Sequence, residues 1–160
     1  MEYTEILINL RKILRSINLE SKRIQKEYGI SIPQYLCLDY LNQQEQYKST
    51  AKKIKEQLNL NASTVSGIVS RLELKGYVAK LPNAGDRRST DIFLTAMGQE
   101  VVNGIPDLMH EKLSRKLKML SENELESVQN ALNILIEFME VEDVDASPLI
   151  APDEKITPKS

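Results

Sequence analysis

Apolar side chains near the start of the chain recur at helical spacing. Within residues 2–27 they fall three or four positions apart, with charged residues between them: Ile6, Leu10, Ile13, Leu14 and Ile17. This period predicts one long amphipathic helix. Gly29 can adopt the left-handed conformation that ends a helix. Ser31 and Pro33 then predict the start of a second helix, which passes Leu41 and ends at the polar segment NQQEQYKS, a predicted loop.

Two shorter apolar patterns of helical period follow, separated by the turn LNLN. The first pattern covers residues 50–58, and the second covers about residues 62–75. The second places its apolar residues at positions i, i+3, i+4 and i+7: Val65, Ile68, Val69 and Leu72. Asn61 can cap the start of this second helix, and Gly76 can end it. The pair therefore predicts a helix–turn–helix.

A β-hairpin is predicted next, because residues 77–81 and 90–94 have strand character on either side of a turn. The turn, residues 82–88, contains the Pro, Asn and Gly that turns favour. Thr95 begins another helical pattern. Pro106 interrupts that pattern after Gly and Ile, so the helix should kink or split there, because proline has no backbone N–H to donate.

The C-terminal part of the chain predicts one more helix and a tail. Ser121 and Glu124 have the spacing of a capping box, and apolar residues then recur at helical spacing to about Glu140. From Val141 onward the chain contains acids and three of its six prolines, which predicts poor order.

The composition of the 160 residues, 41% hydrophobic and 28% charged, is typical of a soluble globular protein. The N-terminus lacks a signal-peptide pattern, and no apolar run approaches the ~20 residues of a membrane span, so we expect a cytoplasmic protein. The single cysteine, Cys37, excludes an internal disulfide framework, and core packing is favoured over redox sensing. His110 is the only histidine, which favours a surface or interface role over a metal site.

Charge is distributed unevenly, although the net charge is only −2. Residues 48–95 contain nine basic and four acidic side chains, a balance of +5, so the rest of the chain carries −7. A basic centre between acidic ends indicates a polyanion-binding segment.

The second helix of the helix–turn–helix has the side chains needed to contact DNA. Opposite its four apolar residues it presents a polar outer face: Ser63, Thr64, Ser66, Gly67, Ser70 and Arg71. Small hydroxyls allow close approach to base edges and phosphates, and Arg71 offers a bidentate donor. On the hairpin tip, Arg87 and Arg88 could be solvated turn residues. Beside a helix–turn–helix, however, arginines are expected to reach the narrow minor groove, with Asp86 holding the Arg88 guanidinium extended.

Helix, turn, helix and a two-stranded wing form a winged helix–turn–helix, and three motifs make residues 31–101 resemble the MarR (multiple-antibiotic-resistance regulator) family of bacterial transcription factors. The motifs are STVSGIVSRLELKGYV, DRRSTDIFLT and the LTxxG start of the next helix. The resemblance implies a mainly α homodimer that binds a pseudo-palindromic operator, most often as a repressor. It also implies that a small-molecule effector or an oxidant releases the protein from DNA.

The resemblance also assigns parts of the chain. Residues 1–30 would be an N-terminal dimerisation helix, 31–98 the winged helix–turn–helix, 99–140 the C-terminal dimerisation helices and 141–160 a flexible tail. The six outer-face residues above fall on the recognition helix, and Asp86 and Arg88 fall on the paired wing positions. Gly67 departs from the pattern, because the family often has a long, commonly basic side chain there. Glycine lowers helix propensity by roughly 1 kcal/mol and removes a base contact.

Two other classes of function are alternatives to DNA binding. An enzyme is not expected, because the chain has no glycine-rich phosphate loop, nucleophile elbow or His/Cys metal set, and so no cofactor or metal is predicted. A winged-helix adaptor that binds protein instead of DNA is the alternative. The basic balance of residues 48–95 favours DNA.

Overall fold

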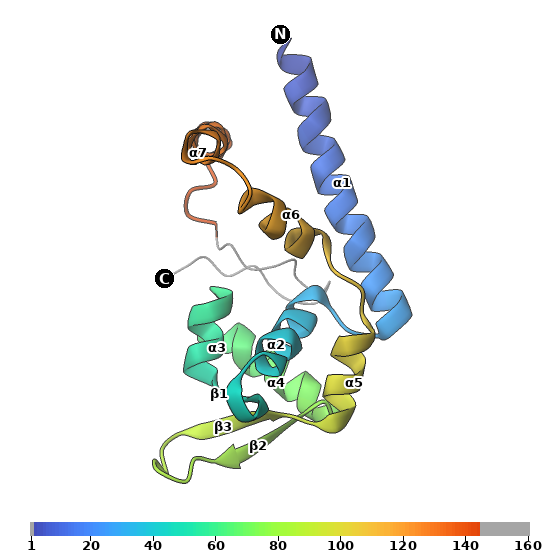
Figure 1. Ribbon diagram of the computed structural model, residues 1–160, viewed down its shortest axis with the longest axis vertical. Helices are drawn as coiled ribbons and strands as arrows, with labels where there is room; N and C mark the ends of the chain where they lie inside the picture. The colour runs from blue at the N-terminus through green and yellow to red at the C-terminus, as the bar shows by residue number, and fades with distance from the viewer. Residues whose placement is uncertain (1, 145–160) are drawn as a thin grey trace. The chain divides into compact units, whose positions relative to one another are not determined.

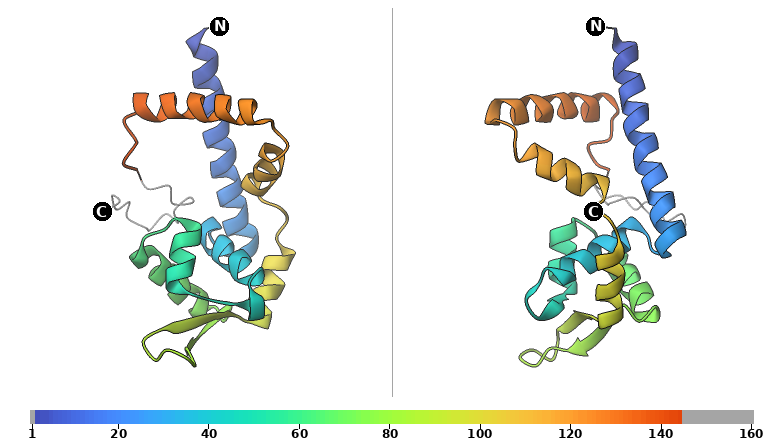
Figure 2. Two further views of the ribbon diagram at one scale, coloured as in Figure 1. Left: turned by 60° about the vertical axis from the view of Figure 1, so that its left-hand side comes forward. Right: turned by 45° about the vertical axis from the view of Figure 1, so that its right-hand side comes forward.

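The computed structural model describes residues 2–144, which form two compact units divided after Pro106 (Figures 1 and 2). The first unit contains α1 (Tyr3–Tyr28), α2 (Ile32–Asn42), the 3₁₀ turn η1 (Glu45–Tyr47), β1 (Lys48–Thr50), α3 (Ala51–Leu58), α4 (Ala62–Leu74), β2 (Val78–Pro82), β3 (Thr90–Leu94) and α5 (Ala96–Gly104). The second contains α6 (Met109–Leu117) and α7 (Glu122–Phe138). The predicted tail lies largely outside the described residues.

The predicted N-terminal helix is confirmed as α1, and its end has the expected cause. Gly29 has φ 69°, and its amide donates to the Gln25 carbonyl at 3.0 Å. Of the 26 residues of α1, only Ile24 is buried. The predicted cap of α2 is also confirmed, because the Ser31 hydroxyl accepts from the Gln34 amide and the Gln34 side chain accepts from the Ser31 amide.

The predicted helix–turn–helix is confirmed as α3 and α4. The Thr50 hydroxyl accepts from the Lys53 amide to begin α3, and Asn61 Oδ1 accepts from the Thr64 amide at 2.8 Å to begin α4. The four apolar residues of α4 are at most 2% exposed: Val65, Ile68, Val69 and Leu72. Each such burial contributes roughly 1.5–3 kcal/mol, so this face fixes which side of α4 remains outside.

The sheet has three antiparallel strands in the order β1-β3-β2 rather than the two predicted. Ile92 on β3 pairs with Ser49 on β1 and with Lys80 on β2. The loop prediction is therefore wrong for Lys48 and Ser49. No apolar alternation marks β1 in the sequence, because only Ser49 of its three residues is buried and the pairing with β3 determines its conformation.

The hairpin of β2, β3 and the connecting turn 83–89 is called the wing below. Figures 1 and 2 show it extending beyond α3 and α4. The Thr95 hydroxyl caps α5 by accepting from the Gly98 amide at 3.1 Å. A Cβ atom at Gly98 would collide with the Tyr77 carbonyl oxygen, so only glycine allows α5 to approach β2 this closely.

The predicted break at Pro106 is confirmed, since α5 ends at Gly104 and α6 begins at Met109. The predicted capping box of α7 is present. The amide and hydroxyl of Ser121 donate to Glu124 Oε2 at 2.8 and 2.7 Å, and these bonds lower the pKa of Glu124. None of the residues of α7 is buried. No helix within residues 2–144 is long and apolar enough to cross a membrane.

Candidate nucleic-acid interface

The outer face of α4 is polar and accessible. Ser63, Ser66 and Arg71 are exposed, and Thr64, Gly67 and Ser70 are partly exposed. At Gly67 the nearest atom that a Cβ would meet is Nη2 of Arg71, 4.0 Å away, so the missing side chain leaves space at the middle of the face. All six predicted recognition-helix residues therefore lie on the side of α4 that the core leaves open.

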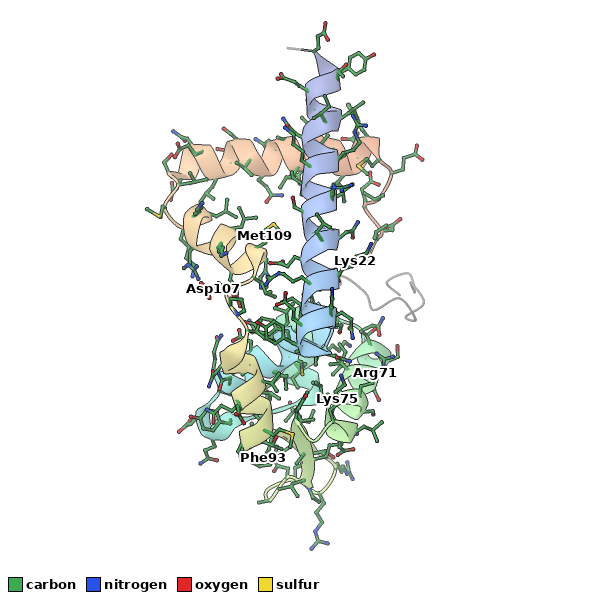
Figure 3. The ribbon with its side chains drawn as sticks, turned by 90° about the vertical axis from the view of Figure 1, so that its right-hand side faces the viewer. Lys22, Arg71, Lys75, Phe93, Asp107 and Met109 are labelled. Atoms are coloured by element: carbon green, nitrogen blue, oxygen red, sulfur yellow. The ribbon has the colours of Figure 1, made fainter. Side chains whose placement is uncertain are left out.

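Two basic residues near the end of α4 have different roles (Figure 3). The Arg71 side chain lies on the exposed face of the helix. Lys75, at the C-cap, donates through Nζ to the Gly29 carbonyl and so joins the end of α4 to the α1–α2 junction. Arg71 thus lies on the exposed face of the predicted recognition helix, whereas the Lys75 side chain contacts the α1–α2 junction.

A hollow of about 480 Å³ connects α4 with the wing. Its wall includes Lys52 of α3, Ser66 of α4, Lys80 of β2 and Arg88 of the wing turn. The structure therefore brings the predicted residues Ser66 and Arg88 to one concave surface, with two lysines beside them. Lys80 was not predicted to belong to the site. Its position on a predicted strand of the hairpin, where alternate side chains point outward, could have indicated that it belongs there.

The tip of the wing presents its two arginines to solvent. Asp86, Arg87 and Arg88 are exposed, and within residues 2–144 the guanidinium groups of Arg87 and Arg88 form no ion pair. Asp86 does not hold the Arg88 guanidinium as expected. Its Oδ1 accepts from the Arg88 backbone amide at 2.9 Å, so Asp86 fixes the conformation of the turn and leaves the arginine side chain exposed.

Basic residues of α3 extend this charged surface. Lys52, Lys53 and Lys55 are all exposed. By contrast, Lys80 Nζ lies 3.7 Å from Glu73, and Lys48 Nζ lies 3.5 Å from Asp91. The positive charge that is not internally paired therefore concentrates on α3 and the wing tip, on either side of the hollow. A surface with this charge attracts a polyanion over a distance of about 8–10 Å at physiological salt.

Cys37 and His110 take no part in this surface. Cys37 is fully buried in α2, and burial raises the pKa of its thiol to about 12, which confirms core packing. His110 is exposed. Among the described residues, no group of three or more His, Cys, Asp or Glu side chains could hold a metal ion.

Two short helices, α3 and α4, are joined by a turn, and α4 has one buried apolar face and one exposed polar face. Together with the basic hairpin beside them, they define the winged helix–turn–helix class of proteins. The family model for the MarR family matches residues 30–90. The HTH-type transcriptional regulator YfiV of Bacillus subtilis is 31% identical over 139 residues, which cover 87% of this chain and 86% of the relative. The chain therefore belongs to the MarR family, and it is a DNA-binding transcriptional regulator.

Other relatives agree with this assignment. The organic hydroperoxide resistance transcriptional regulator of Bacillus subtilis is 30% identical over 125 residues, 78% of this chain and 82% of its own. Among solved structures, the Staphylococcus aureus MepR–DNA complex matches with a TM-score of 0.61 at 24% identity, covering 86% of this chain and 98% of that one. The YusO protein of Bacillus subtilis matches with 0.54 at 24% identity, covering 86% and 94%. The structural likenesses show the fold, and the relatives have regulatory rather than enzymatic roles.

Proposed function

We propose that this chain acts as a homodimeric repressor, which inserts α4 into the major groove of a pseudo-palindromic operator and lays the wing against the adjacent minor groove. The observation that carries the proposal is the concave surface shared by α4 and the wing. It joins Ser66 and Arg88 across one hollow, with Arg71 exposed on the same helix.

The division of α4 into two faces fits a recognition helix. A helix in the major groove needs one face buried in its own protein and one face free to reach base edges. The hydroxyls of Ser63, Thr64, Ser66 and Ser70 are short enough to let the helix backbone approach the bases, and Arg71 can donate two hydrogen bonds to guanine. Gly67 makes no base contact and leaves room for the duplex or for ordered water.

The wing and α3 would supply contacts to the DNA backbone. Arg88 extends from a turn whose backbone Asp86 fixes, and arginine favours the strong negative potential of a narrow minor groove. Arg87 and the lysines of α3 are placed to neutralise phosphates, which positions the protein without reading sequence.

Dimerisation is supported by apolar side chains that the single chain leaves exposed. On α1 these include Ile6, Leu7, Ile13, Leu14 and Leu19, and on α7 they include Leu125, Val128, Leu132, Ile134 and Ile136. Their exposed fractions range from 39% to 58%, in contrast to the closed core around α4. Apolar faces of this length favour association with a second copy of the chain.

Repression, release by a small molecule and a cytoplasmic location complete the proposal. Two similar proteins are named as repressors: MdtR of Bacillus subtilis, which is 28% identical, and IacR of Pseudomonas putida, which is 24% identical. The family resemblance supports an effector that weakens DNA binding.

The first experiment measures binding to a duplex of about 30 bp that the wild-type protein has selected from a random pool, at several salt concentrations. Phosphate contacts release counterions, so the logarithm of the association constant should fall linearly with the logarithm of salt, with a slope of about −0.9 for each phosphate neutralised. An adaptor that binds protein would select no duplex and show no such slope.

The second experiment tests the dimer by sedimentation at micromolar concentration. Leu14→Glu places a charge on the exposed apolar face of α1 and should convert the dimer to monomers. The matched control is Leu74→Glu, because Leu74 is 88% exposed on α4 and outside the proposed dimer face. A wild-type chain that sediments as a folded monomer would refute the dimer.

A further inference from the structure

Asn83 lies at the start of the wing turn and uses both ends of its amide group. Its Oδ1 accepts hydrogen bonds from the backbone amides of Gly85 and Asp86 at 2.8 and 3.0 Å. Its Nδ2 donates to Asp91 Oδ1 at 3.0 Å. One side chain therefore joins the tip of the wing to an acid on β3.

Asp91 is itself held in place. It is 6% exposed, and Lys48 Nζ on β1 lies 3.5 Å from its other carboxylate oxygen. The same Lys48 ammonium lies 5.5 Å from the centroid of the Phe93 ring, which limits its movement. A buried carboxylate is costly unless it is paired and hydrogen-bonded, so the ion pair with Lys48 and the bond from Asn83 together fix Asp91.

From Asn83 the hydrogen bonds continue to the arginine-bearing backbone. The Asp86 backbone amide donates to Asn83 Oδ1, and the Asp86 carboxylate accepts from the Arg88 backbone amide at 2.9 Å. The Asp86 carbonyl accepts from the Ser89 amide at 3.1 Å, and the Asn83 amide donates to the Ser89 carbonyl at 3.0 Å. A continuous path thus runs from β1 to the backbone of Arg88.

We infer that Asn83 is a positioning residue for DNA recognition, which transmits the fixed position of Asp91 and Lys48 to Arg87 and Arg88. Lys48, Asn83 and Asp91 are together called the wing brace. The inference rests on the proposed DNA binding. It adds that the wing brace orders the wing in the protein without DNA. A turn that is already ordered loses less conformational freedom on binding, so the brace raises affinity without touching the duplex.

A purely structural role for the wing brace makes a different prediction. The residues from 84 to 88 are all exposed and contribute nothing to the buried core. If Asn83 served only to stabilise the protein, its removal would lower the melting temperature and leave the affinity of the folded protein unchanged. If Asn83 positions Arg88, removal of the Asn83 side chain weakens DNA binding. The size of this loss of affinity then depends on whether Arg88 is present.

The test is a double-mutant cycle on the duplex selected by the wild-type protein. Asn83→Ala should weaken binding by the folded protein about tenfold, similar to Arg88→Ala, when binding is measured well below the melting temperature of each variant. The double variant should lose clearly less than the product of the two single effects, because Asn83 acts through Arg88. Multiplicative losses, or wild-type affinity in Asn83→Ala, would overturn the inference.

An exchange of the two partners tests the hydrogen bond itself. Asn83→Asp keeps the acceptor for the turn amides but opposes two carboxylates, so binding should weaken. Adding Asp91→Asn restores the hydrogen bond between the two side chains with its direction reversed, and the amide oxygen at position 91 can still accept from Lys48. The double variant N83D/D91N should therefore recover part of the affinity that N83D loses. A double variant no better than N83D would overturn the inference.

Failure of the proposed function gives a separate result. In that case the wild-type protein would select no duplex, or Arg88→Ala would bind as the wild type does, and the wing brace would have no arginine to position. A chain that binds DNA through Arg88 and is indifferent to Asn83 refutes the inference alone.

Discussion

The winged module, residues 30–105, and the two long helices α1 and α7 bury their apolar residues to very different degrees. In the module, Leu38, Leu41 and Leu72 are completely buried. In α1 only Ile24 is buried, and in α7 no residue is. The module completes its core within one chain, whereas the long helices have apolar faces that only another surface can cover. This difference separates the part proposed to bind DNA from the parts proposed to join two copies.

Charge follows the same division. The segment of residues 48–95 carries +5, whereas residues 119–144 contain seven acidic side chains and no basic one. An acidic helix such as α7 repels DNA phosphates, so it is not suited to the DNA contacts proposed for α4 and the wing. The contrast between the two regions therefore gives each prediction a control within the same chain.

The largest expected effect concerns the closed core of the module. Burial raises the pKa of the Cys37 thiol from 9.0 to about 12, so at pH 8 its thiolate fraction should be about a thousandfold smaller than that of an exposed cysteine. Thiol labelling of the native protein should be slower by about that factor or more. The variant C37A/A84C, with the thiol on the exposed wing turn, should react at an ordinary rate.

The pH dependence of this burial has a definite sign. The folded state holds the Cys37 proton up to about pH 12, whereas the unfolded chain releases it near pH 9. The unfolded state then binds fewer protons, so the Cys37 contribution to stability should be complete below pH 9 and lost as the pH rises toward 12. For the labelling prediction, rapid reaction of the Cys37 thiol in the native protein at pH 8 would be the contradicting result, because it would show that the core opens.

The next effect compares the two kinds of apolar face. Leu72→Ala should lower the free energy of unfolding by about 2–5 kcal/mol, because it leaves a cavity in the core. Leu132 on α7 is 48% exposed, so Leu132→Ala should mainly raise the dissociation constant of the dimer. Urea unfolding and sedimentation measure the two changes. Equal effects of both variants on unfolding, with no change in association, would remove the distinction between the regions.

A smaller effect separates arginines of the two regions. Arg88→Ala should weaken operator binding by about 1–3 kcal/mol, because it removes the minor-groove contact. Asp86→Ala should produce part of this loss, because Asp86 fixes the Arg88 backbone. Arg15→Ala on α1 is the matched control, since Arg15 is exposed but outside the winged module, and it should bind as the wild type does. Wild-type affinity in a folded Arg88→Ala would mean that the arginines are only solvated.

The smallest effect distinguishes the two neighbouring arginines of the wing. If Arg87 contacts only phosphate, Arg87→Ala should weaken binding to selected and unselected duplexes alike, and should reduce the salt slope by about one. Titrations at several salt concentrations on both duplexes measure this. A loss confined to the selected duplex would assign sequence reading to Arg87 as well.

The sequence was sufficient to predict elements that repeat a period or carry a cap. The apolar spacing from Val65 to Leu72 identified both the buried face of α4 and the opposite face with its candidate site residues. Local signals at Gly29, Asn61 and Pro106 marked the ends of helices because each acts on its own backbone. These features depend on residues close together in the chain, so periodicity and cap chemistry determine them.

Most of the features that were missed depend on residues far apart in the chain. The strand β1 has no apolar alternation and exists because Ser49 pairs with Ile92. The bond between Asn83 and Asp91 also depends on the register of the finished hairpin, as does the ion pair of Asp91 with Lys48. One missed feature is local. Asp86 was expected to hold the Arg88 guanidinium, but its carboxylate accepts from the Arg88 backbone amide, which requires no ordering of a long side chain.

Footprinting on the selected duplex tests the central claim most directly, because it depends on the winged module and the dimer together. Two protected major-groove segments should lie on one face of the duplex, with centres about 10–10.5 bp apart, and minor-groove protection should lie beside each. Two chains should be bound to each duplex. One protected segment with one bound chain, or uniform protection without this spacing, would contradict the account.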